Sequence, residues 1–364
     1  MTTSAAGSNR TPPPPPAPRP RWRRSLGGLT LAAITVSVVA SASFVATRDS
    51  VQAPSQSTST SGAKSLEDEF TSLVTTVVPS VVQIESPAGL GSGVVYDAAG
   101  HIVTNAHVVG AETQFTVTAA NGTPRKATLL GSYATEDLAV LQVDGGGLRA
   151  AVFADSATVK VGQIVLAVGN PLGLSSSVTD GIVSATGRLV AEPSNGAAPG
   201  TTLRDTIQTS AAINPGNSGG ALVDLAGRVI GIPTLAAHDA QLGGAAAGIG
   251  FAIPSNTVRD IADQLIKDGK VTHSRRAYLG VQTAVATDGV AVASTTAGGP
   301  AERAGIRAGD VIAALAGSPV RTPQDLRGRL AALEPGQTIE VRLIDGELGA
   351  RVVPVTLGEL PGTP

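Results

Sequence analysis

A serine, a histidine and an aspartate lie in sequence contexts that suit nucleophilic catalysis. Ser218 is flanked by glycines in Gly-Asn-Ser-Gly-Gly at 216–220, His107 ends Thr-Asn-Ala-His at 104–107, and Asp137 begins Asp-Leu-Ala-Val-Leu at 137–141. A serine hydroxyl is a poor nucleophile at neutral pH, so it needs an imidazole to accept its proton and a carboxylate to orient that imidazole. The sequence therefore predicts a catalytic triad of His107, Asp137 and Ser218.

The glycines around Ser218 predict a tight turn, because glycine adopts backbone conformations that other residues avoid. We expect the backbone N–H groups of Gly216, Asn217 and Ser218 to form an oxyanion hole, with those of Gly216 and Ser218 converging on the oxygen of a tetrahedral intermediate. The turn would then stabilise the charge that attack by Ser218 creates.

The chain order of these residues separates two arrangements. The pattern Gly-x-Ser-x-Gly around Ser218 also fits the nucleophile elbow of α/β-hydrolases, for which Asp260 and His273 could follow as partners. An elbow serine opens a helix, whereas residues 221–232 are two short apolar runs around an Ala-Gly turn and predict a hairpin. The order histidine, aspartate, serine matches the chymotrypsin-like double barrel instead.

Short β-branched runs separated by glycine turns fill the region up to about Ile253. The clearest lie at 81–84, 93–96, 101–104, 115–118, 140–143, 164–168, 181–184 and 229–232. Such spacing favours barrels or sandwiches. We predict a mainly β fold of two barrels, which the similarity to the chymotrypsin-like arrangement implies are six-stranded, preceded by a short helix at Phe70–Val78. The triad would then lie in the cleft between the two barrels.

A helix and a separate α/β module are expected after the barrels. Apolar residues at 258, 261, 262, 265 and 266 share one helical face, with Ser255 as the cap and Gly269 as the stop. Beyond them, a helical stretch at 323–333 and a strand at 338–343 belong to the module.

The beginning of the chain predicts export. Residues 11–20 are proline-rich, arginines follow at 21, 23 and 24, and residues 26–46 carry no charged side chain. At about 1.5 Å rise per residue, such a helix just spans a hydrocarbon layer of roughly 30 Å, and the preceding arginines should stay in the cytoplasm. We expect a single-pass transmembrane helix with the rest of the chain outside the cytoplasm.

Two processing alternatives remain open. Ala40-Ser41-Ala42 resembles a signal-peptidase site, so cleavage after Ala42 would release the chain, and Arg23-Arg24-Ser25-Leu26 is a thin match to a twin-arginine signal. The apolar run continues past Ala42 and exceeds the usual signal core of about 7 to 15 residues. We therefore favour an uncleaved anchor; either outcome exports the catalytic part.

The composition excludes several functions. The formal net charge of −2 predicts no general attraction to nucleic acid, and the absence of cysteine excludes disulfides, thiolate nucleophiles and cysteine zinc sites. His101, His238 and His273 have no partners at metal-ligand spacing. We predict no metal and no cofactor.

Six motifs occur in a fixed order along the chain. They are Gly-Ser-Gly at 91–93, Thr-Asn-Ala-His-Val-Val at 104–109, Asp-Leu-Ala-Val-Leu at 137–141, Val-Gly-Asn-Pro at 168–171, the segment 212–220 around Ser218, and Gly-Phe-Ala-Ile-Pro at 250–254. In this combination the chain resembles membrane-anchored bacterial HtrA (Deg-type) serine proteases with one PDZ domain, over about 77–357.

The resemblance implies five regions: a cytoplasmic tail at 1–25, a transmembrane signal-anchor at 26–46, a flexible linker at 47–66, a trypsin-like protease domain of two barrels at 67–272 and a PDZ domain at 273–361. It implies an ATP-independent endopeptidase of the cell envelope that acts on misfolded or specific proteins and assembles as a homotrimer. In this family the PDZ groove binds C-terminal peptides and can regulate the protease.

The resemblance also places the specificity residues. Ala212 stands where trypsin-like relatives need a carboxylate, so cleavage is expected after small aliphatic residues and not after Lys or Arg. The residues implied for the primary pocket are Ile213, Ala236 and Ile249, and those implied for the PDZ peptide site are Leu279, Gly280 and Val281.

One departure from the family pattern affects the expected specificity. After Gly231-Ile232 the family usually has Asn-Thr-Ala, whereas this chain has Pro-Thr-Leu at 233–235. Proline removes a backbone donor from the segment expected to pair with substrate, so the preferred cleavage site can differ.

A different class of function remains as the alternative. The PDZ module and an inactive pair of barrels could capture misfolded chains as a dormant holdase, because proteins of this kind can stay inactive until a ligand orders their loops.

Overall fold

The computed structural model describes residues 60–362 except 88, 146, 171–176, 192–201, 215, 240–243, 288 and 346–348. The predicted tail at 1–25, the predicted transmembrane segment at 26–46 and most of the predicted linker lie outside the described residues. Within the described part, no helix combines the length and the apolar character needed to cross a membrane.

The first described element is the helix α1 (Thr60–Val77), followed by a short 3₁₀ turn at Val78–Ser80. Leu73 and Val77 are buried, and Phe70 packs beside them against the core that the two barrels share. The helix was predicted only from Phe70, and the segment up to residue 66 was assigned to a flexible linker. The predicted start of the helix was wrong, since it begins at Thr60, within the segment assigned to the linker.

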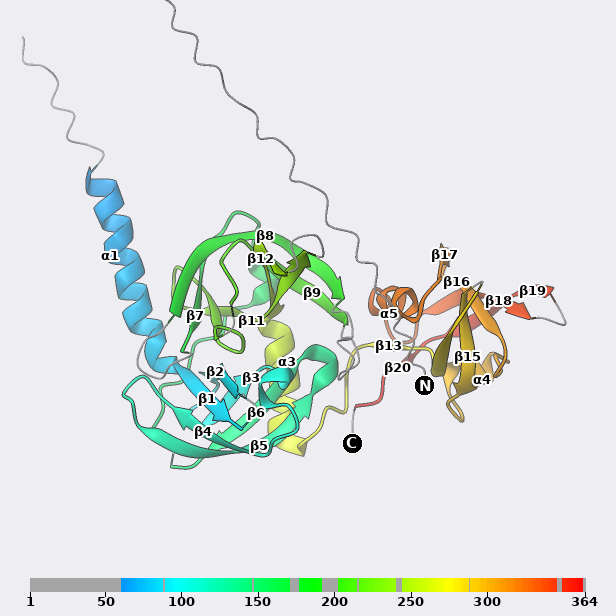
Figure 1. Ribbon diagram of the computed structural model, residues 1–364, viewed down its shortest axis with the longest axis horizontal. Helices are drawn as coiled ribbons and strands as arrows, with labels where there is room; N and C mark the ends of the chain where they lie inside the picture. The colour runs from blue at the N-terminus through cyan, green and yellow to red at the C-terminus, as the bar shows by residue number, and fades with distance from the viewer. Residues whose placement is uncertain are drawn as a thin grey trace, which may run out of the picture. The chain divides into compact units, whose positions relative to one another are not determined.

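Two closed β-barrels follow (Figure 1). The first, with strand order β1-β2-β3-β6-β5-β4, consists of β1 (Val81–Ser86), β2 (Gly89–Val95), β3 (His101–Thr104), β4 (Gln114–Thr118), β5 (Pro124–Tyr133) and β6 (Leu138–Val143). The second, with order β10-β11-β12-β9-β8-β7, consists of β7 (Ile164–Gly169), β8 (Ser177–Ala191), β9 (Thr202–Thr209), β10 (Ala221–Asp224), β11 (Val229–Asp239) and β12 (Gly244–Pro254). The predicted double six-stranded barrel is confirmed, and so is the hairpin after Ser218, formed by β10 and β11.

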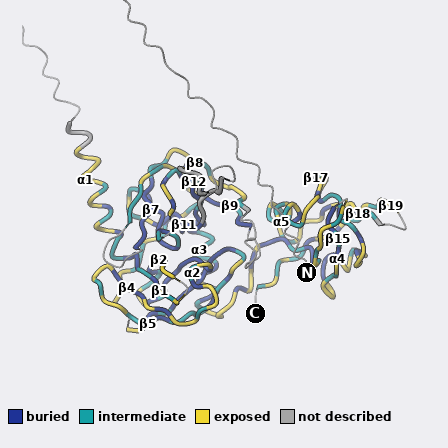
Figure 2. The backbone as a smooth tube through the Cα atoms, viewed as in Figure 1, coloured by how far each residue is buried: buried dark blue, intermediate teal, exposed yellow. Residues whose placement is uncertain are grey.

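Each barrel has its own apolar interior, and a third core joins the two. Figure 2 shows buried backbone along the strands of both barrels. The shared core includes Val103 and Leu138 of the first barrel, Ile232 of the second, and Leu265 of the helix α3 (Ser255–Asp268). The two halves of the predicted triad are therefore held on one packed unit.

The start of α3 differs from the prediction. Ser255 was expected to cap this helix, but its Oγ donates to Ala154 O at 2.7 Å, and the N-cap is Pro254, which makes no side-chain capping bond. At the other end, Gly269 stops the helix as predicted, with φ +69° and its N–H bonded to Leu265 O.

The C-terminal module has its own core. A sheet of order β14-β15-β16-β18-β19 packs with the helices α4 (Pro300–Arg303) and α5 (Pro323–Ala331). The strands are β13 (Ala277–Tyr278), β14 (Val281–Ala286), β15 (Gly289–Thr295), β16 (Val311–Leu315), β17 (Ser318–Pro319), β18 (Thr338–Asp345), β19 (Gly349–Thr356) and β20 (Gly358–Glu359). Helix α5 begins with a capping box between Thr322 and Asp325, which satisfies N–H groups at its first turn.

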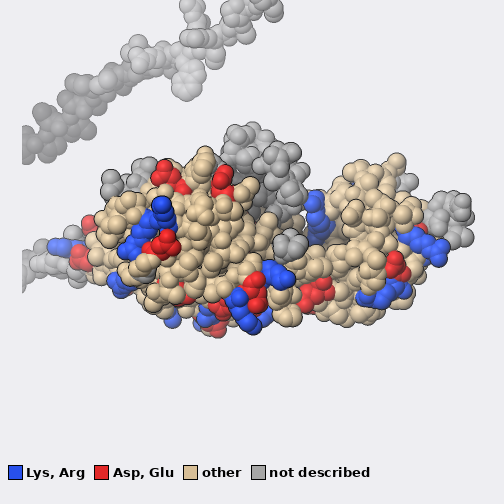
Figure 3. All heavy atoms as spheres, turned by 90° about the horizontal axis from the view of Figure 1, so that it is seen from below, with Lys and Arg blue, Asp and Glu red and all other residues tan. Residues whose placement is uncertain are grey.

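Charges of both signs lie interspersed on the face drawn in Figure 3. This agrees with the small formal net charge of −2.

Candidate active site

His107 and Asp137 are hydrogen-bonded partners. His107 lies in the one-turn helix α2 (Ala106–Val109), and its Nδ1 is 2.9 Å from Asp137 Oδ2 and 3.1 Å from Oδ1. The backbone N–H of His107 also donates to Asp137 Oδ1 at 2.9 Å. A carboxylate facing Nδ1 favours the tautomer with the proton on that atom, so Nε2 carries the lone pair that a general base needs.

The Asp137 carboxylate is further fixed by the second barrel. Thr234 Oγ1 of β11 donates to Asp137 Oδ2, and Asn105 Nδ2 donates to the Asp137 carbonyl at 3.0 Å. Asp137 itself takes a left-handed conformation, φ +52°, just after the 3₁₀ turn η2 (Ala134–Glu136). Several donors thus surround the carboxyl group of a residue that is only 8% exposed, as buried polar groups require.

Ser218 lies in the turn that precedes β10. The side chain of Asn217 braces this turn by accepting from Asn214 N at 3.0 Å and donating to Ala212 O at 2.9 Å. The Oγ of Ser218 is 3.5 Å from the carbonyl oxygen of Thr234, the residue whose hydroxyl contacts Asp137. Thr234 therefore touches both halves of the proposed triad.

A second contact joins the Ser218 turn to the first barrel. Ser92 of β2 is fully buried; its Oγ donates to Gly216 O, and its N–H donates to Ser218 O at 3.1 Å. The same Oγ accepts from Asn170 N at 2.8 Å. Ser92 thereby fixes the carbonyl groups on both sides of Asn217 against the barrel that carries His107.

The prediction for the oxyanion hole needs one correction. The backbone N–H of Asn217 donates to Asn214 O at 3.1 Å, inside its own turn, so it does not face an incoming oxygen. The N–H groups of Gly219 and Gly220 are also used, by Pro233 O and Asn217 O. Gly216 and Ser218 remain the proposed donors.

Comparison with known proteins agrees with this geometry. A model of the trypsin-like peptidase domain matches residues 91–232, and a PDZ domain model matches residues 277–348. Serine protease PepD of Mycobacterium tuberculosis is 37% identical, over 96% of this chain and 80% of that protein. The chain belongs to the HtrA family of serine proteases. The resemblance inferred from the six motifs is confirmed, as is the chymotrypsin-like protease fold followed by a PDZ domain.

Two further HtrA relatives show the extent of the match. The probable periplasmic serine endoprotease DegP-like of Rhizobium meliloti is 44% identical over 270 residues, which cover 71% of this chain. The chain spans about half the length of that relative, 51%. The solved structure of the HtrA-type protease AlgW with decapeptide is 32% identical, with a TM-score of 0.57 over 81% of this chain and 99% of that one.

The residues implied for the primary pocket lie on the second barrel. Ile213 is buried in the core of the second barrel and faces Gly250, where an added Cβ would lie 2.3 Å from Ile213 Cγ1. Ile249 is 37% exposed, and Ala236 pairs with Gly250 across β11 and β12. Gly250 thus lies directly beside Ile213. From the sequence, Gly250 was named only as part of a motif and not as a pocket residue.

Pro233, the departure from the HtrA pattern, lies within β11. Its carbonyl accepts from Gly219 N at 3.0 Å, and the register between β11 and β12 shifts between Pro233 and Leu235. The proline therefore lies at an irregular point of the strand, next to Thr234.

The residues implied for the PDZ peptide site lie at the start of β14, an edge strand of its sheet. Leu279 is buried in the domain core, so only its backbone could face a peptide. Gly280 has φ +79°, and its carbonyl accepts from Thr296 N at 2.9 Å. Val281 is half-buried and begins the edge strand.

Two of the three histidines outside the proposed triad lie near carboxylates. His101 Nδ1 is 2.6 Å from Asp97 Oδ2, and His273 Nδ1 is 3.7 Å from Glu359 Oε2. The side chain of His238 lies outside the described residues. Within the described part of the chain, no three His, Asp or Glu side chains gather in a way that could hold a metal ion.

Substitution of Gly219 tests how tightly the Ser218 turn packs against the first barrel. An alanine Cβ at this position would lie 2.3 Å from Ser92 O and 2.5 Å from Thr104 Oγ1, and φ is +79°. We expect Gly219→Ala to lower the free energy of unfolding by about 2 kcal/mol or more, since left-handed strain adds to a backbone clash. Chemical denaturation measures the loss.

The matched control is Gly187→Ala. Gly187 has φ +68°, but an added Cβ would meet nothing within 4 Å, so only the strain of about 1–2 kcal/mol is expected. Equal losses in the two variants would show that the contact with Ser92 is not as tight as the structure has it.

Proposed function

We propose that this chain is an ATP-independent serine endopeptidase that acts outside the cytoplasm on misfolded or specific envelope proteins. The observation that carries the proposal is the His107–Asp137 pair, with Nδ1 2.9 Å from Oδ2, linked through Thr234 to the Ser218 turn. The names of the relatives, which are serine endoproteases, support the same activity.

In the proposed reaction, Ser218 Oγ attacks the peptide carbonyl carbon while His107 Nε2 accepts the hydroxyl proton. The N–H groups of Gly216 and Ser218 stabilise the oxyanion, and Asp137 stabilises the imidazolium. The imidazolium then donates its proton to the amine, which departs as the peptide bond breaks. The acyl group remains bonded to Ser218. A water molecule, deprotonated by His107, releases the acyl group and restores the serine.

We propose small aliphatic side chains at the residue before the cleaved bond. Ile213 belongs to the apolar core of the second barrel and lies next to Gly250. Ala212 provides no carboxylate for a basic side chain. An apolar pocket of this kind discriminates by about 1–3 kcal/mol per methylene, so the preference should be graded and not absolute.

The partners and the location are also proposals. We propose that the PDZ domain binds C-terminal peptide segments along the edge strand β14, by strand addition. The solved AlgW complex with a decapeptide supports peptide binding in a relative. We further propose an N-terminal anchor at residues 26–46 and a homotrimer. The periplasmic naming of relatives supports an extracytoplasmic site of action.

A fluorophosphonate probe tests the enzymatic proposal directly, because it forms a covalent bond only with an activated serine. We expect one probe per chain, with the adduct mapped by mass spectrometry to Ser218, together with cleavage of unfolded casein. A chain that stays unlabelled and cleaves nothing, with or without a PDZ-binding peptide, would contradict the proposal. That result would favour the dormant holdase, which the comparisons do not support.

A further inference from the structure

Glu136, the residue before Asp137, has a buried carboxyl side chain. It is 2% exposed, and its Oε1 is 2.7 Å from Arg276 Nε and 3.7 Å from Arg204 Nε. A buried carboxylate is tolerated only when positive charges or hydrogen bonds compensate for its lost hydration. Glu136 is the last residue of the turn η2 and directly precedes Asp137. The side chain of Glu136 therefore binds this turn to the two arginines.

Arg276 links three parts of the molecule. Its side chain is mostly buried and donates to Glu136 of the first barrel and to Thr202 O of β9 in the second barrel. Its carbonyl accepts from Leu360 N, at 2.8 Å, at the end of the PDZ domain. Arg276 immediately precedes the PDZ match at 277–348, so this domain begins with a residue anchored in both barrels.

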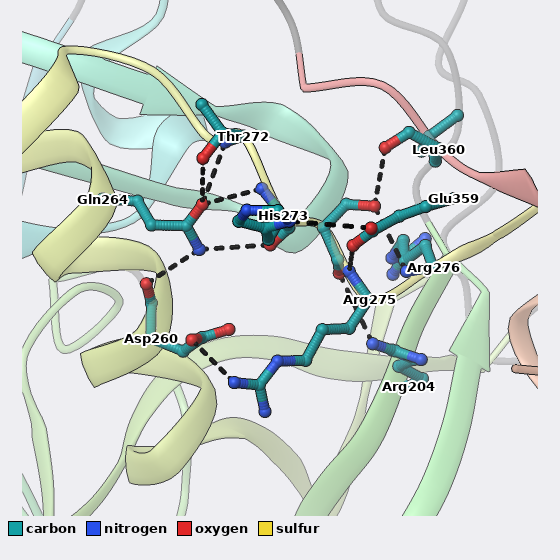
Figure 4. Close-up of polar contacts among 10 residues, drawn as sticks. Arg204, Asp260, Gln264, Thr272, His273, Arg275, Arg276, Glu359 and Leu360 are labelled. Carbon is teal, nitrogen blue, oxygen red and sulfur yellow. Dashed lines mark hydrogen bonds and ion pairs between the residues drawn. The ribbon is translucent and has the colours of Figure 1, made fainter. Parts of the chain in front are cut away.

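The connector around Arg276 is bonded on both sides, as Figure 4 shows. Gln264 Oε1 of α3 accepts from Thr272 N at 2.9 Å and His273 N at 2.8 Å. Arg275 contacts Asp260 of α3 through its side chain at 3.1 Å and Glu359 of β20 through its N–H at 2.6 Å. The connector is therefore held to α3 through Gln264 and, through Arg276, to η2.

We propose that Arg276 and Glu136 are a positioning pair that aligns Asp137 with the catalytic serine. The inference rests on the proposed endopeptidase function. His107 and Asp137 belong to the first barrel and Ser218 to the second, so their alignment depends on contacts that cross between barrels. The Glu136 cluster is such a contact, next in sequence to the triad itself.

Removing Arg276 leaves Glu136 buried beside Arg204 alone, whose Nε is 3.7 Å away. A single-turn element with an under-compensated buried charge relieves this by moving the charge toward water. Because Asp137 is the next residue and has a left-handed backbone, movement of η2 displaces its carboxylate from His107 Nδ1. Misplacement of about 1 Å in a catalytic array can cost on the order of 100-fold in rate.

The test compares Arg276→Met and Glu136→Gln with the full-length wild type. The substrate is a short peptide p-nitroanilide with valine before the cleaved bond, which has no free C-terminal carboxylate and so bypasses the PDZ groove. We expect kcat to fall about 10- to 100-fold with KM within about twofold. The acid limb of the kcat/KM profile should move to lower pH, because an imidazolium with a displaced carboxylate loses its proton more readily.

Arg275→Met is the matched control, since this neighbouring arginine is largely exposed and bonds Asp260 at the surface. It should leave kcat and the acid limb unchanged. The double variant at 276 and 136 should be no slower than the slower single variant, because both remove one shared interaction.

Three outcomes decide between the hypotheses. If Arg276→Met lowers the melting temperature but leaves kcat and the acid limb as in the wild type, the pair is structural and the inference is wrong. If that variant does not fold, Glu136→Gln decides: it removes the charge at nearly the same size and shape, so an unchanged kcat and acid limb overturn the proposal. A wild type that neither cleaves nor takes up fluorophosphonate would overturn the proposed function itself.

Discussion

Ser218→Ala is expected to lower kcat/KM on a peptide substrate by about 10⁴- to 10⁶-fold, close to complete loss in most assays. The substitution removes only the attacking oxygen, whereas His107, Asp137 and the proposed oxyanion donors remain. At about 1.4 kcal/mol per factor of ten, the loss corresponds to roughly 5–8 kcal/mol of transition-state stabilisation. Initial rates over a range of enzyme concentrations measure it.

Stability should hardly change in the same variant. The Ser218 hydroxyl makes one long contact, 3.5 Å to Thr234 O, at the outer limit of a hydrogen bond. The matched control is Ser72→Ala on the exposed face of α1, which should retain full activity. A Ser218→Ala protein that keeps more than about 1% of wild-type activity, free of contaminating protease, would disprove the nucleophile assignment.

The proposed triad could be inferred from the sequence because each of its members lies in a short local motif. Glycines flank Ser218 for a physical reason visible in the structure: Gly216 has φ +114° and Gly219 has φ +79°, with no room for a side chain at the latter. Positions that require glycine in the structure can be recognised as glycines in the sequence. The alternation of β-branched runs and turns gave the two barrels for a similar reason, since strand and turn preferences are local.

The residues that support the triad were not predicted, because their partners are distant in sequence. Thr234 donates to a carboxylate 97 residues away, and Ser92 bonds a carbonyl 124 residues away. Ser92 was noted within a glycine motif, and Thr234 only beside the unusual Pro233. Nothing in the sequence around Ser92 or Thr234 specifies which group will lie next to its side chain in the folded barrels.

The same limit explains the misplaced cap of α3 and the unforeseen Glu136 cluster. A serine before an amphipathic run normally caps the helix, but Ser255 finds Ala154 O instead, 101 residues earlier. Glu136 and Arg276 are 140 residues apart, and each alone resembles an ordinary surface charge. Long-range polar contacts of this kind link the barrels and the PDZ boundary, and they determine how well the predicted catalytic groups are aligned.

Asp137→Asn is the second change expected to have a very large effect, a drop of about 10⁴-fold in kcat/KM near neutral pH. An asparagine keeps the size of the side chain but carries one acceptor and one NH₂ donor. Because Thr234 Oγ1 and two N–H groups of His107 all point at this position, the amide cannot accept from all of them. The imidazole then favours the tautomer with the proton on Nε2, which cannot accept the proton of Ser218.

The chain offers an unusually close control in Asp97→Asn. Asp97 Oδ2 is 2.6 Å from His101 Nδ1 in the same barrel, so the substitution alters a second Asp–His pair outside the triad. Partial burial raises the pKa of Asp97, but hydrogen bonds from the His101 side chain and backbone outweigh this and lower it overall, so the Asp97 carboxylate is charged in a neutral assay. We expect Asp97→Asn to keep kcat/KM within about twofold of the wild type. If the two variants lose activity equally, the loss at Asp137 reflects damage to the barrel and not a lost catalytic role. If only Asp137→Asn loses activity and its melting temperature is unchanged, the Asp137 carboxylate has the orienting role.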